Sequence, residues 1–127
     1  MAGLAAAVKI AILDALNKND TYQGPAALYI GLHTGDPGAD GTANELDYTD
    51  YERQSIAFVD ADASGSVNSA DILFPETDEI VGDVTHFSVH SSASGANLVY
   101  SGTLTGDEVE IEKRPKIAAG KLLVKFL

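Results

Sequence analysis

The sequence contains no cysteine, so the chain can form neither a disulfide nor a thiolate metal site. It also has no apolar run near the roughly 20 residues that a membrane-spanning helix needs. Lys9 and Asp14 interrupt the apolar stretch at residues 2–15, and this interruption argues against a signal peptide. We therefore expect stability to come from burial, hydrogen bonding or oligomerisation.

Basic residues are scarce. Eight lysines and arginines stand against 19 acids, which gives a formal net charge of −11. Nucleic-acid binding needs a clustered basic surface, so this balance argues against direct contact with DNA or RNA. The cluster at residues 113–116 follows acids within residues 107–112, so its local field is mixed. An acidic chain of this kind suits a basic patch on a protein partner, and we expect neither a nucleic-acid nor a membrane partner.

The N-terminal region has the pattern of one amphipathic helix. Apolar side chains recur every four residues, at Leu4, Val8, Ile12 and Leu16. With the alanines between them, they predict a helix over residues 3–16, ended by the polar run at residues 17–20. Two interpretations of this arm, residues 1–20, stay open: it packs on its own domain, or it docks on a neighbouring subunit.

From residue 21 onward the pattern changes to short strands separated by Gly, Asn, Asp and Ser. The predicted strands are residues 26–33, 51–59, 69–74, 85–91, 96–105, 108–113 and 122–127. Within residues 85–91 the apolar Phe87 and Val89 alternate with polar residues, so one strand face is apolar and the other is polar. The chain is predicted to be mainly β, an antiparallel β-sandwich of jelly-roll or immunoglobulin-like type over residues 21–127, with one N-terminal α-helix.

One loop has the spacing of a calcium loop. Its oxygen-bearing side chains at loop positions 1, 3, 5 and 12 are Asp60, Asp62, Ser64 and Asp71. Calcium loops of this type lead into a helix and end in glutamate, whereas here a strand-like segment follows and the last residue is aspartate. A solvated hairpin turn is the favoured interpretation, and a calcium site is the alternative.

The sequence offers no catalytic constellation. Acids crowd residues 36–52, but no nucleophile and base accompany them. The three histidines are expected to be polar residues on strand faces: His33, His86 and His90. Arg53 is expected to pair with Asp50 or Glu45, within the chain or across a subunit contact. We predict no enzymatic activity and no cofactor.

Several segments, in order, resemble a family of small virion proteins of tailed bacteriophages. They are residues 29–45 (YIGLHTGDPGADGTANE), 51–54 (YERQ), 72–77 (ILFPET), 84–89 (VTHFSV), 95–98 (GANL) and 102–104 (GTL). Members are labelled as head decoration proteins or as tail fibre proteins. This chain departs from the family pattern at Glu52, where a small residue is frequent, and at residues 78–82, where a Trp-Gly pair is frequent.

The resemblance implies a non-enzymatic, multimeric structural protein. The leading hypothesis is a capsid decoration (cement) protein on the capsid surface of the virion, assembled in the host cytoplasm. Its partners would be the major capsid protein and sister copies in a homotrimer. The alternative is a tail or tail-fibre-associated structural or receptor-binding protein. The predicted interface residues lie on the arm and in or beside the loop after the first strand: Leu4, Val8, Ile12, Leu16, Asp36, Pro37, Glu45 and Arg53.

Overall fold

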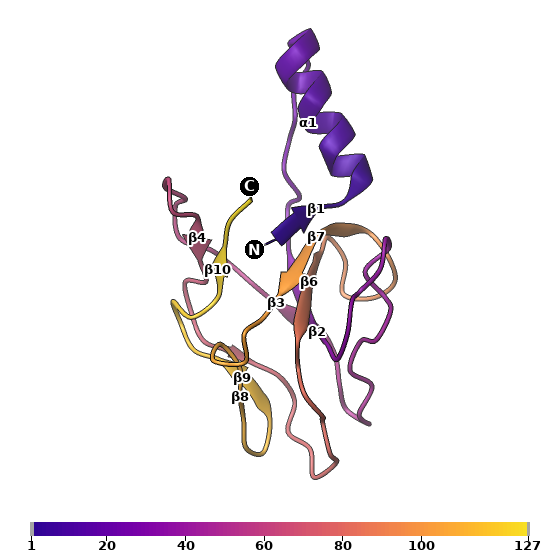
Figure 1. The fold of residues 1–127 in the computed structure, drawn as a ribbon, viewed down its shortest axis with the longest axis vertical. Helices are drawn as coiled ribbons and strands as arrows, with labels where there is room; N and C mark the ends of the chain where they lie inside the picture. Colours follow the sequence, from indigo (N-terminus) through magenta and orange to yellow (C-terminus); the bar gives the residue numbers. More distant parts are fainter. Residues whose placement is uncertain (1, 127) are drawn as a thin grey trace.

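The computed structural model describes residues 2–126 and has a five-stranded main sheet in the order β1–β7–β6–β2–β3. These strands are β1 (Ala2–Leu4), β2 (Tyr29–His33), β3 (Gln54–Ser55), β6 (His86–His90) and β7 (Leu98–Thr103). Every neighbouring pair is antiparallel. The long pairings are β2 with β6 and β6 with β7, so these three strands form the centre of the sheet (Figure 1).

Two smaller antiparallel sheets complete the β-structure. One has the order β5–β9–β8 and the other pairs β10 with β4. Their strands are β4 (Ser66–Val67), β5 (Ile72–Leu73), β8 (Glu110–Ile111), β9 (Pro115–Ile117) and β10 (Leu123–Val124). Side chains of these sheets join those of the main sheet in one apolar core. The result is the predicted mainly β, sandwich-like fold with a single helix.

The apolar face of the main sheet forms this core. Ile30 lies opposite Val89, and Leu32 lies opposite Phe87, in the register of β2 and β6. All four side chains are at most 2% exposed. Residues of β5, β9 and the segment before β10 pack with them, including Ile72, Ile117 and Leu122. Alternation of side chains along β2 and β6 leaves the polar residues of both strands on the opposite face.

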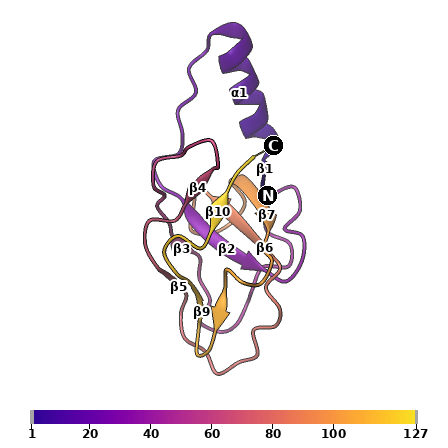
Figure 2. The same ribbon diagram turned by 60° about the vertical axis from the view of Figure 1, so that its left-hand side comes forward.

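The single helix, α1 (Ala6–Lys18), projects from the sheets. Figures 1 and 2 show it standing away from the β-structure, while the chain after it returns alongside it toward β2. No residue of α1 is buried. The predicted stripe therefore divides: Leu4 and Val8 pack against the core, whereas Leu16 is 76% exposed. That residues 1–20 form a unit separate from residues 21–127 stays a prediction.

The start of the predicted helix was wrong. Residues 2–4 form β1, which pairs with Tyr100, Ser101 and Gly102 of β7, because the open edge of β7 offers backbone partners that a helix would forgo. The amide of Ala5 also bonds to the carbonyl of Val99, at 2.9 Å. The helix then continues two residues beyond the predicted end, to Lys18, and Asn19, with a φ of 58°, forms a left-handed cap after it.

Several predicted strands are shorter than expected. The predicted strand at residues 51–59 forms only β3 and a single bridge at Phe58. The last predicted strand forms only β10, and its terminal residue, Leu127, lies outside the described residues. Within residues 2–126, no helix is long and apolar enough to cross a membrane.

Candidate functional site

The segment between β2 and β3, residues 34–53, folds over the polar face of the main sheet. A bridge between His33 and Glu45 closes its first part into a loop of residues 34–44. The amide of Leu46 donates to the carbonyl of Leu32, and the amide of Thr34 donates to that of Asn44. Residues 45–53 then cross back to β3. We call residues 34–44 the presented loop.

The acids of the presented loop form turns. Asp36 Oδ1 accepts a hydrogen bond from the amide of Gly38 at 2.9 Å. Asp40 Oδ1 accepts bonds from the hydroxyl and the amide of Thr42, and these bonds lower the pKa of Asp40. Gly41 has a φ of +76°, and a Cβ there would lie 2.6 Å from a methyl of Leu98, so glycine is required. The loop therefore has a fixed shape, as turn-forming carboxylates provide.

Beneath the loop, a serine lies between two histidines. Ser88 Oγ is 2.7 Å from His33 Nε2 and 2.9 Å from His90 Nε2, and all three residues are 0% exposed. Both Nδ1 atoms carry a hydrogen, because each lies 2.7 Å from a carbonyl that can only accept, that of Ala43 for His33 and that of Ala96 for His90. Burial lowers the pKa of both histidines, which favours neutral rings. The Ser88 hydroxyl has one hydrogen and can donate it to only one Nε2 atom, and His90 Nε2 also lies 3.2 Å from the carbonyl of Gly41.

An ion pair lies beside this cluster. Arg53 donates from Nε and Nη2 to the two carboxylate oxygens of Glu45, each at 2.9 Å. The hydroxyl of Tyr51 donates to Glu45 at 2.7 Å and accepts from the amide of Leu32 at 3.2 Å. Burial opposes ionisation of Glu45, but the bonds from Arg53 and Tyr51 outweigh it and hold the pKa of Glu45 below its ordinary value.

These contacts form one polar layer, which we define as His33, Glu45, Tyr51, Arg53, Ser88 and His90. Gly31 makes room for it, since a Cβ at that position would lie 2.6 Å from a Glu45 carboxylate oxygen. No described buried side-chain nitrogen or oxygen lacks a hydrogen-bond partner. The hydrogen bonds of this layer join the presented loop to β2 and β6 and hold the loop in place.

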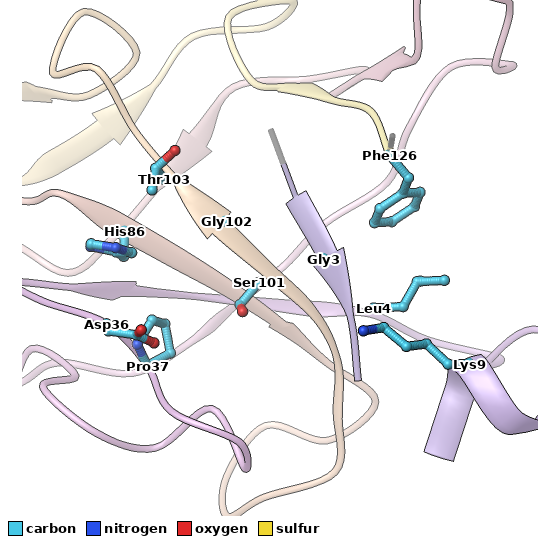
Figure 3. A pocket seen from close by; sticks show the side chains of 10 residues that line it. All are labelled: Gly3, Leu4, Lys9, Asp36, Pro37, His86, Ser101, Gly102, Thr103 and Phe126. Carbon is cyan, nitrogen blue, oxygen red and sulfur yellow. The ribbon is translucent and has the colours of Figure 1, made fainter. Parts of the chain in front are cut away.

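Two groups of predicted interface residues meet at a surface groove. It crosses β1, β7 and β6, with Asp36 and Pro37 on one side and Leu4 and Lys9 on the other (Figure 3). Phe126 lies beside Leu4 at the same end, and His86 lies near Asp36. The remaining predicted residues do not line it: Val8 packs against the core, Ile12 and Leu16 project with α1, and Glu45 and Arg53 lie in the polar layer.

The predicted calcium residues do not converge. Asp62 and Gly65 form a tight hairpin through mutual backbone bonds, and Asp62 Oδ1 accepts from the amide of Ser64 at 2.8 Å. Asp71 instead accepts from the amide of Ala119 at 2.8 Å. Among residues 2–126 there is no group of three side chains that could hold a metal ion. This geometry matches the hairpin interpretation.

Sequence reasoning missed the polar layer as a unit. It placed His90 and Ser88 on a polar strand face but did not predict that another segment covers this face. In the structure, residues 34–53 cover it. The predicted partner of Arg53 was Asp50 or Glu45, and in the structure Arg53 pairs with Glu45. One signal was available: the glycine at position 31 in a strand, which indicates close approach of other atoms.

The fold and the polar layer define a β-rich scaffold that holds a shaped loop and carries a projecting arm. The family model described as podophage GP4 fiber I protein gp80 matches residues 3–125 of the chain. The chain belongs to this family and is a phage virion structural protein. No curated protein matches the chain. The resemblance to tailed-phage virion proteins is thereby confirmed.

Proposed function

We propose that the chain is a non-enzymatic, fibre-associated structural protein of a podophage virion. The observation that carries this proposal is the match of residues 3–125 to a family described as a fiber I protein. Of the two roles expected from sequence, the fibre-associated role has more support from this description than capsid decoration has. The fibre role therefore takes first place.

The features of the chain that suit this role are surfaces for protein partners. The presented loop is held by buried hydrogen bonds, so it keeps one shape before a partner arrives, which lowers the ordering cost of binding. The groove of Figure 3 lies between that loop and the base of the arm. The net charge of −11 favours a partner with a basic surface.

A non-enzymatic role is supported by the buried position of the group formed by Ser88, His33 and His90. Ser88 and its two histidines resemble parts of a catalytic group, yet each is 0% exposed. Both Nδ1 atoms are already bonded to backbone carbonyls. A nucleophile must reach a substrate carbonyl, and this hydroxyl faces the underside of the presented loop.

Capsid decoration is the second candidate, and one observation favours it. The projecting α1, with its exposed apolar side chains, has the form of an arm that reaches onto an adjacent subunit. In that role the partners would be the major capsid protein and sister copies, arranged as a homotrimer. Avidity across a symmetric shell would then multiply weak contacts.

Copy number and position on the particle test the two roles together. Quantitative mass spectrometry of purified virions measures copies per major capsid protein, and gold-labelled antibody against the chain locates it by electron microscopy. The fibre role predicts a few copies and label at fibres. A ratio near one copy per capsid subunit, with label over the whole head, would overturn it in favour of decoration.

A further inference from the structure

The outward face of α1 is apolar and makes no contact within the described part of the chain that would bury it. Ile10 is 61% exposed, Leu13 is 55% exposed and Leu16 is 76% exposed. Spacings of three residues place these side chains on one helix face, and Lys9 lies beside them. The face carries no carboxylate. Apolar surface gathered in this way marks a site of interaction.

A second apolar surface is a groove at the end of the β-structure where α1 begins. It lies between the hairpin that contains Asp62 and the segment after β10. Its apolar lining is Phe58, Ala61, Ala63, Tyr100, Val124 and Phe126. The rings of Tyr100 and Phe126 meet edge to face with centroids 5.4 Å apart, and Phe126 is still 45% exposed. We call this surface the C-terminal groove.

Charge indicates what occupies the C-terminal groove. Asp62 lines it, Asp60 adjoins it, and Lys125 is the one cation among the residues that line it. α1 carries two lysines and one aspartate, whereas the rest of the chain carries 18 acids and six bases. A helix with a cationic, carboxylate-free face is thus complementary to the acidic remainder of a second copy.

We propose that α1 of one copy docks through Ile10, Leu13 and Leu16 in the C-terminal groove of a second copy. Lys9 then faces the acidic rim at Asp60 and Asp62. The contact joins two different surfaces, so it builds a ring or a pair of copies that exchange arms. The inference rests on the proposed function as a virion structural protein, and it names which surfaces would join copies of the chain.

Analytical ultracentrifugation of the full chain tests the contact. The helix variant is Leu13→Glu with Leu16→Glu, which keeps good helix formers at exposed positions. The groove variant is Ala61→Arg, which fills the groove from an exposed position and repels Lys9. Each variant should weaken self-association by at least about tenfold. The matched control is Ile80→Glu, at a side chain 97% exposed and outside both surfaces, and it should assemble like the wild type.

Mixing the two variants sharpens the test. The helix variant keeps an intact groove and the groove variant keeps an intact helix, so an equimolar mixture should form a complex that neither variant forms alone. No complex in the mixture would overturn the proposal and indicate a helix-to-helix contact. A wild-type chain that stays monomeric at every concentration would also overturn the proposed contact. If the gold-labelled antibody still located the chain at fibres, the proposed function would be retained without this contact.

Discussion

Both faces of the sheet are largely buried at β2 and β6, but by different means. The apolar face packs Ile30, Leu32, Phe87 and Val89 into the core, and many side chains of similar size contribute to it. The polar face is covered by residues 34–53 and depends on a few directed hydrogen bonds. Apolar packing tolerates changes of shape that keep volume, whereas a buried charge without its partner is costly. The difference teaches that the presented loop depends on a few specific atoms.

The largest expected effect is the loss of stability when the ion pair of the polar layer is broken, compared with the loss from an exposed ion pair. Arg53→Met removes the partner of the partly buried Glu45 and should lower the free energy of unfolding by about 3–5 kcal/mol. Urea denaturation measures it. The control is Arg114→Met, whose partner Glu76 lies on an exposed surface, and it should cost about 0–1 kcal/mol. If both variants lose the same free energy of unfolding, the ion pair of the polar layer contributes no more to stability than an exposed ion pair does.

The next effect concerns the apolar face. Leu32→Ala should cost about 2–5 kcal/mol, because it removes a fully buried side chain and leaves a cavity. Leu32→Met keeps the volume and should cost less than about 1.5 kcal/mol. Denaturation of both variants measures how far the core tolerates a change of shape. If the methionine variant is as unstable as the alanine variant, the contrast between the two faces fails.

A smaller effect is expected at the hydroxyl between the histidines. Ser88→Ala leaves the buried Nε2 of His33 without its partner and should cost about 1–3 kcal/mol. Hydrogen exchange should show the loss of protection concentrated in residues 34–44. Ser101→Ala, on the strand position paired with Ser88, should change stability by less than about 0.5 kcal/mol. Unchanged exchange in the presented loop would contradict its attachment through Ser88.

The smallest expected effect is a pH dependence between pH 7.5 and 5.5. The pKa of His33 and that of His90 are lowered in the folded chain, so the unfolded chain binds more protons in this range. The contribution of the two neutral histidines to stability is therefore complete when the pH is above 6.5, the ordinary histidine pKa that the unfolded chain keeps. It falls as the pH drops below that value. Melting temperature against pH measures the fall. His90→Gln should flatten the profile, and a profile as steep as that of the wild type would contradict the assignment.

Periodicity was enough to predict the fold class but not every element. Alternation in residues 85–91 and the helical spacing around Val8 are local signals, and both led to correct elements. β1 and β9 were missed because each has only three residues. β1 takes its hydrogen bonds from β7, which is distant in the chain, and β9 lies between the distant β5 and its chain neighbour β8. Residues 2–4 had a helical pattern, yet pairing with the edge of β7 decided their conformation.

The polar layer could be predicted only in pieces. Its members range from residue 33 to residue 90, and their meeting depends on the register of β2 against β6, which sequence does not reveal. The polar alternation of Ser88 and His90 was visible, but the cover over them was not. The choice between Asp50 and Glu45 as partner of Arg53 likewise needed the path of residues 45–53 across the sheet.

The arm enters the main sheet at two places, and this has a mechanical consequence. Its N-terminal end continues into the edge strand β1, while the returning chain enters β2, and β7 and β6 lie between these strands. A pull on the tip of α1 is therefore divided between an edge strand of three residues and a central strand bonded on both sides. β1 is bonded to one neighbour and β2 to two, so we expect the edge strand to be the weaker of the two attachments of the arm.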